Sequence, residues 1–163
     1  MDDFVKHKDI SFLIFSIEDE DFAINVKHVI EVVRVESLTK VPKTEQYLEG
    51  ILNFRGRIVS VVNANQKLNI ENLKDRKNKY VIILELQFEE RTVWIGLSVR
   101  RVKKVIEMTE NQVQPVPEFG CYYNPEFLEG ALHINEQFIM VLDITRVLST
   151  KELEFVTSVN KTN

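Results

Sequence analysis

The residue types that most often do chemistry in proteins are few in this 163-residue chain and are scattered along it. There is one cysteine, Cys121, and there are three histidines, His7, His28 and His133. A lone cysteine forms neither an internal disulfide nor a thiolate cluster, and the histidines lack the close spacing of a metal site. Cys121 and His133 could act as nucleophile and base, but no recognisable motif supplies a third, orienting group. We therefore predict a protein that is not an enzyme and has no metal and no cofactor.

The composition is that of a folded domain with an excess of acid. The chain has 21 Lys and Arg against 25 Asp and Glu, a net charge of −4, and 44% hydrophobic residues. Its uncharged stretches are far shorter than the ~20 apolar residues that cross a membrane. The N-terminal residues 1–6 are acidic and lack the apolar core of a secretory signal. These features predict a cytoplasmic domain without direct membrane insertion.

Any interaction site must be positioned by β-strands, because ten short apolar runs dominate the chain. Each run is rich in Val, Ile, Phe or Tyr and is bounded by charged, Gly, Pro or Asn residues. The predicted strands are 12–17, 22–26, 29–35, 51–54, 58–62, 80–87, 92–99, 102–108, 131–134 and 138–142. Tight turns are expected at 18–21, 55–57 and 88–91, and short helices at 63–68 and 143–148. A capping box at 149–152 predicts a C-terminal helix over about 150–159. The fold class is therefore all-β.

An internal repeat is the strongest pattern in the sequence. Residues 47–68 match residues 127–148, 80 positions later and without a gap, and a weaker match joins 22–35 to 95–108. A polar stretch at 69–79 separates the two copies. We therefore predict a single domain over 1–163 made of two five-stranded units, 11–70 and 78–148. Five short strands close into a barrel that side chains fill, so a ligand would dock in a groove between the units.

Several motifs, in their order along the chain, resemble a known family. They are V-I-E-V-V-R at 29–34, T-K-V-P at 39–42, Y-L-E-G-I-L-N-F-R-G at 47–56, T-E-N-Q-V-Q-P-V-P-E-F at 109–119 and F-L-E-G-A-L at 127–132. From about residue 11 to 156 the chain resembles CheW, the coupling-protein family of bacterial chemotaxis. The resemblance implies two SH3-like β-barrel subdomains. It also implies a non-catalytic adaptor that binds the regulatory domain of the histidine kinase CheA and the cytoplasmic tip of methyl-accepting chemoreceptors.

The resemblance also implies where these partners bind. The receptor-binding residues would be Val29, Glu31, Val33, Gly50, Arg55 and Val105, with Arg55 able to pair with Glu31. The kinase-facing residues would be Tyr80 and Ile82. Recruitment to membrane-associated receptor arrays and self-association through like subdomains follow from the same resemblance.

Each of these residues also has a simpler explanation. Glu31 fits the outward face of a half-buried strand, Arg55 fits a solvated turn, and the three valines fit ordinary strand positions. Gly50, together with the equivalent Gly130, fits a close approach of two backbones. Core packing explains Tyr80 and Ile82 equally well.

The chain departs from the family pattern in two places. Asn63-Ala64-Asn65 stands where the family usually has Asp-Leu-Arg, and Ser60 replaces a usual proline. Arg100, Arg101 and Lys104 replace positions that are often acidic or small.

The basic run 100–104 supports an alternative function, a small-barrel nucleic-acid-binding protein. Phe119, Tyr122, Tyr123 and Phe127 would then be its stacking residues. The acidic chain and the absence of an RNP or zinc motif favour a solvated strand face instead. We therefore expect no nucleic-acid partner.

Overall fold

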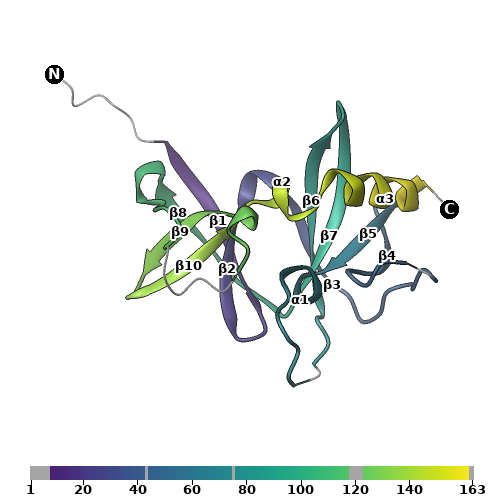
Figure 1. Ribbon diagram of the computed structural model, residues 1–163, viewed down its shortest axis with the longest axis horizontal. Coiled ribbons are helices and arrows are strands. Elements are labelled where there is room, and N and C mark those ends of the chain that lie inside the picture. Colours follow the sequence, from purple (N-terminus) through teal and green to yellow (C-terminus); the bar gives the residue numbers. More distant parts are fainter. Residues whose placement is uncertain (1–7, 43, 75, 118–122, 162–163) are drawn as a thin grey trace.

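The computed structural model describes residues 8–42, 44–74, 76–117 and 123–161, and these residues form two five-stranded sheets (Figure 1). The first sheet has the strand order β8-β1-β2-β10-β9 and the second β3-β6-β7-β5-β4. The first contains β1 (Asp9–Ile17), β2 (Glu20–Asn25), β8 (Arg101–Thr109), β9 (Leu128–Ile134) and β10 (Gln137–Leu142). The second contains β3 (Val29–Arg34), β4 (Leu48–Phe54), β5 (Arg57–Asn63), β6 (Tyr80–Phe88) and β7 (Arg91–Val99). All ten predicted strands and the all-β class are confirmed.

The repeat is present, but the two sheets are not its two copies. The first copy contributes β1 and β2 to one sheet and β3, β4 and β5 to the other, while the second copy does the reverse with β6–β7 and β8–β10. The chain changes sheet through the 3-10 turn Val26–His28 and again at Arg100. The expected boundaries 11–70 and 78–148 therefore describe the sequence repeat and not the folded units. Each copy lends its N-terminal hairpin to the sheet of the other.

The equivalence of the two sheets extends to their pairing. Each sheet contains one parallel strand pair, β2–β10 in the first and β5–β7 in the second, and its other strand pairs are antiparallel. In each, the loop after the first edge strand forms a bridge to the other edge strand. These bridges are Thr39 with Ile51 and Gln114 with Ala131. One bridge therefore draws the two edges of each five-stranded sheet together.

The hydrophobic core has three parts. The largest part lies between the sheets and includes Phe15 and Phe22 from the first and Ile82 and Leu84 from the second. A smaller cluster around Phe12 belongs to the first sheet, and another around Phe54, Val59 and Ile83 belongs to the second. Strands β1 and β6 are buried on both faces, which is why their sequences are nearly continuous apolar runs.

Three short helices complete the fold at the predicted places. They are α1 (Ala64–Leu68), α2 (Ile144–Val147) and α3 (Thr150–Lys161). Asn63 and Asp143 cap α1 and α2 through their side chains. The predicted capping box is formed before α3, since the Ser149 hydroxyl accepts from the Glu152 N–H and the Glu152 carboxylate accepts from the Ser149 N–H. Helix α3 packs against β5 and so lies over the second sheet (Figure 1).

Candidate protein-docking site

The predicted pair of Glu31 and Arg55 is formed. The Arg55 guanidinium, in the β4–β5 turn, donates at 2.6 Å to the carboxylate of Glu31 on β3, which lies 24 positions earlier in the chain. The two side chains are 42% and 58% exposed. An ion pair with this much solvent contributes only about 0–1 kcal/mol to folding. The pair therefore does little to hold the fold together and is available to a partner.

The turn that carries Arg55 is a two-residue hairpin with a defined backbone. Phe54 pairs with Arg57, and the intervening Arg55 and Gly56 have φ values of 51° and 78°. Positive φ at both positions is the type I′ geometry that suits the twist of a hairpin. The Asn53 side chain accepts from the Gly56 N–H at 3.1 Å, and the Arg55 guanidinium lies 4.8 Å from the centre of the Phe54 ring. Asn53 and Phe54 thus position Arg55.

Sequence reasoning did not single out Asn53 or Phe54. The available signal was their place inside the N-F-R-G segment. An Asn three residues before a turn glycine is a common backbone-binding residue of turns.

Gly50 is buried and acts through its backbone. A Cβ placed there would lie 2.7 Å from the Thr39 carbonyl oxygen, and one at Gly130 would lie 2.8 Å from the Gln114 oxygen. Both glycines sit beneath the bridge that draws the edges of their sheet together. The close-approach explanation is therefore confirmed, and Gly50 influences the surface only by letting the loop after β3 cross β4.

The three valines lie on two different sheets. Val29 and Val33 are half-buried on β3, Val29 against the shared core and Val33 against the core of the second sheet. Val105 lies on β8 of the first sheet and is 58% exposed, which is unusual for a large apolar residue. Strands β3 and β8 occupy equivalent edge positions in the two sheets. Of the six residues assigned to the receptor, Val29, Glu31 and Val33 thus lie on β3 and Val105 on β8, whereas Gly50 lies on β4 and Arg55 in the β4–β5 turn.

Tyr80 and Ile82 begin strand β6, and the structure separates them. Ile82 is completely buried in the shared core, so its side chain offers no surface to a partner. Tyr80 is half-buried at the margin of the same core. Packing therefore accounts for Ile82, and a direct contact with the kinase stays a prediction for Tyr80 alone.

The asparagines that depart from the family pattern form a hydrogen-bonded network. The Asn63 amide donates to Glu49 at 3.0 Å, and the Asn65 amide donates to Glu18 in the β1–β2 turn at 3.0 Å. Asn78, near the end of the linker, donates to the Asn65 carbonyl at 2.9 Å. Neutral amides here connect α1 to both the first sheet and the linker.

The basic run has few of the features that a nucleic-acid site needs. Arg101, Lys103 and Lys104 are exposed on β8, but Lys103 pairs with Asp21 at 2.9 Å. Of the four proposed stacking residues, Tyr123 packs edge-on against Phe22 and Phe127 packs against the shared core. Phe119 and Tyr122 lie outside the described residues. The described aromatic rings are thus used in packing.

The proposed nucleophile and base cannot be assessed as a pair, because Cys121 lies outside the described residues. The His133 ring stacks on Phe138, with ring centres 4.8 Å apart.

A partly buried ion pair between Lys67 and Glu152 fastens helix α3 to the fold. The Lys67 ammonium contacts both Glu152 oxygens, at 2.7 and 2.6 Å, and lies over the Tyr47 and Phe127 rings. Burial by itself would raise the pKa of Glu152, but hydrogen bonds from Lys67 and from the Ser149 backbone outweigh it and lower that pKa. Burial raises the pKa of Tyr47 to about 12, with Glu152 adding to the shift. This cluster is structural.

A two-sheet β protein with a weak ion pair on an exposed edge has the features of a protein-docking scaffold. Comparison with known proteins identifies its family. The model of the CheW-like domain matches residues 11–152. The chain therefore belongs to the CheW-like domain family, a non-enzymatic scaffold family, and is a chemotaxis scaffold or adaptor.

Individual relatives agree with this assignment. The chain is 30% identical to the chemotaxis protein CheW of Klebsiella aerogenes over 152 residues, covering 93% of this chain and 89% of that protein. It is 30% identical to the chemotaxis protein CheW of Thermotoga maritima, covering 86% and 89%. The crystal structure of the scaffolding protein TtCheW from Thermoanaerobacter tengcongensis superposes with a TM-score of 0.76 at 28% identity, covering 89% of this chain and 97% of that one.

Within the described ranges, no helix is both long and apolar enough to cross a membrane.

Proposed function

We propose that this chain couples methyl-accepting chemoreceptors to the histidine kinase CheA without catalysing a reaction. The observation that carries the proposal is the Glu31–Arg55 ion pair, which is exposed, joins β3 to the β4–β5 turn and contributes little to folding. A charged pair that is kept at the surface without a stabilising role is well suited to select a partner. The residues also match the family motif from which a receptor contact was expected.

The receptor tip is a helical hairpin, so it needs an apolar strip with a polar rim. On β3, Val29 and Val33 supply half-buried apolar side chains, and on β8, the equivalent edge strand of the other sheet, Val105 supplies an exposed one. Glu31 and Arg55 supply the rim, and Gly50 lets the loop after β3 pass close to it. We expect binding to depend on a few central residues, each contributing about 2 kcal/mol or more.

The kinase would dock through a separate surface. The regulatory domain of CheA resembles this chain, so like subdomains would meet in a pseudo-symmetric contact, with Tyr80 near it. The same kind of contact would allow self-association. Recruitment to receptor arrays would then place this cytoplasmic adaptor at the membrane, and signalling would be a shift between packed arrangements.

A three-component sedimentation experiment tests the proposal. Receptor-bearing membranes, CheA and the chain are mixed, and the kinase that sediments with the membranes is measured. The wild-type chain should carry CheA into the pellet, whereas Arg55→Glu should reduce that amount at least about tenfold, because it places two carboxylates side by side. Arg91→Glu is the matched control, since it makes the same charge change at an exposed hairpin position of the same sheet.

Charge exchange separates a specific contact from general electrostatics. Glu31→Arg combined with Arg55→Glu rebuilds an ion pair in the opposite orientation. If the receptor contacts each of the two charges directly, the double variant should fold with wild-type stability and still carry less CheA into the pellet. Undiminished co-sedimentation of CheA with the Arg55→Glu variant would disprove the proposed receptor surface.

A further inference from the structure

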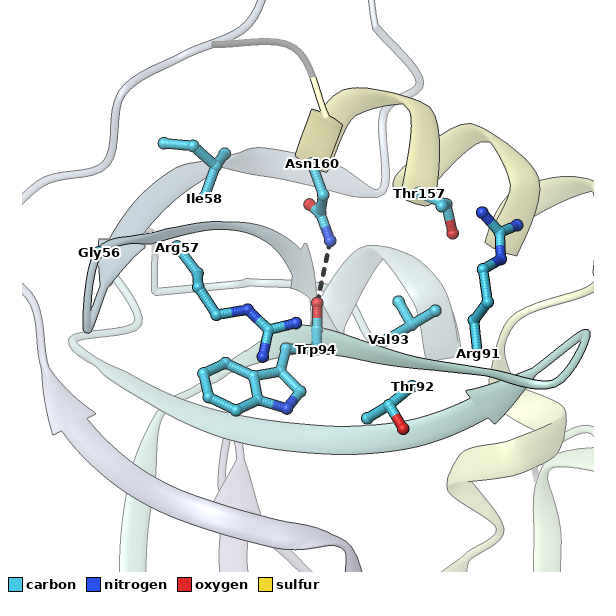
Figure 2. A pocket seen from close by; sticks show the side chains of 9 residues that line it. All are labelled: Gly56, Arg57, Ile58, Arg91, Thr92, Val93, Trp94, Thr157 and Asn160. Atoms are coloured by element: carbon cyan, nitrogen blue, oxygen red, sulfur yellow. Dashed lines mark hydrogen bonds between the residues drawn. The ribbon is translucent and has the colours of Figure 1, made fainter.

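A hollow lies where two parallel strands of the second sheet separate. Strands β5 and β7 pair only from Ser60 with Ile95 onward, so the residues before these positions diverge. The space between them has a volume of about 310 Å³ and is bordered by the start of both strands and by helix α3 (Figure 2). Small-molecule sites in proteins begin at this size.

The inner end of the hollow is closed by the side chain of Asn160 from α3. Its carbonyl oxygen accepts from the Ser60 N–H at 2.8 Å and from the Ser60 hydroxyl at 2.6 Å, and its amide donates to the Trp94 carbonyl at 3.1 Å (Figure 2). The amide thus continues the ladder where the two strands can no longer reach each other. A proline at position 60 has no N–H to donate, so this closure uses the departure of this chain from the family pattern.

Two arginines face the hollow. The Arg57 guanidinium lies 3.6 Å from the centre of the Trp94 ring, and within the described residues it has no hydrogen bond and no ion pair. Stacking holds its plane in place and leaves its N–H groups free. Arg91 stands on the other side, near Thr157 (Figure 2). Among the residues that the structure describes, its guanidinium has one ion pair, a loose and exposed contact with Glu89 at 3.6 Å that contributes little.

We propose that this hollow binds a small phosphate-bearing anion, either inorganic phosphate or a phosphate monoester, between Arg57 and Arg91. A planar guanidinium donates two parallel hydrogen bonds to phosphate oxygens, and two such groups balance a dianion. The exposed Thr92 and the Asn160 amide border the same space and add polar groups. This binding is independent of receptor coupling, although Arg57 and Arg55 belong to the same turn.

The chain contains one tryptophan, so Trp94 reports directly on this site. Phosphate is titrated into the protein at constant pH and ionic strength, with chloride as the balancing anion, while Trp94 emission is recorded. A second series uses glycerol 3-phosphate to separate the free anion from a monoester. Line broadening of the ³¹P signal provides a second readout, because Arg57→Gln changes the surroundings of the indole as well as the charge.

We expect a saturable change in the wild-type protein. Arg57→Gln and Arg91→Gln should each weaken binding by about tenfold or more, since each removes charge-assisted hydrogen bonds. Arg101→Gln, which removes an exposed arginine from the other sheet, should leave the affinity unchanged.

Three results would overturn the proposal. One is a linear response to phosphate, and another is an equal loss of affinity in the Arg101→Gln variant. The third is saturation by hexaglutamate together with no response to either phosphate compound, which would assign the hollow to an acidic protein segment instead.

Discussion

Equivalent places in the two sheets carry opposite charge. In each sheet the two parallel strands diverge at one end, and we call this place a fork. The fork between β5 and β7 presents Arg57 and Arg91. The fork between β10 and β2 is bordered by Asp19, Glu20 and Asp21 around a hollow of about 390 Å³. The backbone arrangement is the same in both, since each fork lies beside the parallel pair of its sheet. Duplication has therefore preserved pairing and core while the side chains at the forks have diverged.

The two forks differ in how their charges are satisfied. Asp21 is paired with Lys103, Asp19 lies 3.5 Å from Lys74, and Glu20 accepts from the Tyr123 hydroxyl. Among the described residues, by contrast, the Arg57 guanidinium contacts only the face of the Trp94 indole. Within the described residues, each acidic side chain of the β2–β10 hollow thus has a polar partner, and Asp21 has a close ion pair, whereas Arg57 has its guanidinium N–H groups left for a ligand. The comparison shows that a shared framework does not imply a shared function.

The largest effects should come from testing whether the two sheets are independent. Phe12 and Phe15 lie on opposite faces of β1, Phe12 in the core of the first sheet and Phe15 in the shared core. Phe12→Ala and Phe15→Ala should each lower the free energy of unfolding by about 3–5 kcal/mol. Because the hairpins are exchanged, both variants should still unfold in one transition.

Urea unfolding followed by two probes checks this prediction. Trp94 fluorescence reports on the second sheet, and far-UV circular dichroism reports on both. In the Phe12→Ala variant the two midpoints should coincide at the lowered urea concentration. A Trp94 midpoint that stays at the wild-type value would mean that the second sheet folds alone.

The exchange of hairpins is also the main feature that the sequence did not predict. Strands, turns and caps depend on neighbouring residues, so the Asn63, Asp143 and Ser149 caps could be recognised locally. Strand partners depend on distant residues, and consecutive strands usually pair. The apolar runs of β1 and β2 fit either sheet, so nothing in them shows that the chain leaves the first sheet at the turn Val26–His28.

The candidate sites follow the same division between local and distant information. Glu31 and Arg55 could be predicted because each belongs to a short motif. The hollow at the basic fork could not, because Arg57, Trp94 and Asn160 come together only in the folded chain. The Arg-Gly-Arg turn and the single tryptophan were the only signals of it in the sequence.

The glycines beneath the two bridges test whether the sheets are equivalent in packing. Gly50→Ala and Gly130→Ala should each lower the free energy of unfolding by about 1–3 kcal/mol, because the new methyl group meets a backbone carbonyl below 3.0 Å. At Gly130 a second close neighbour is the Val113 side chain, so Gly130→Ala combined with Val113→Ala should recover part of the loss. A neutral Gly50→Ala would contradict the close approach.

Glu129 on the first sheet and Glu152 on the helix over the second sheet should give opposite dependences of stability on pH. The net pKa of Glu152 lies below its ordinary value of 4.5, so its contribution to stability is present above pH 4.5 and is lost as the pH falls through the folded-state pKa. Burial, with Asp143 adding to it, raises the pKa of Glu129 above 4.5. Its ionisation therefore removes stability as the pH rises from 4.5 through the raised pKa.

Urea unfolding from pH 4 to 7 measures both effects. Glu152→Gln should lower the free energy of unfolding by about 1–2 kcal/mol at pH 7 and by less at pH 4, since it removes charge-assisted hydrogen bonds to Lys67. Glu129→Gln should instead raise the free energy of unfolding above that of the wild-type protein at pH 7, and should raise it less at pH 4. If the change in the free energy of unfolding followed the same pH profile in both variants, the prediction of opposite pH dependences would be wrong.

The smallest effect concerns a turn position that is occupied by different residues in the two copies of the repeat. Gly56 in the β4–β5 turn and Glu136 in the β9–β10 turn are equivalent by the 80-residue spacing, with φ values of 78° and 64°. A side chain is disfavoured at such angles, so Glu136→Gly should raise the free energy of unfolding by up to about 1 kcal/mol and Gly56→Glu should lower it by a similar amount. Glu136→Ala keeps the Cβ and should give no gain. If Glu136→Ala stabilised the protein as much as Glu136→Gly, loss of negative charge rather than backbone strain would account for the effect.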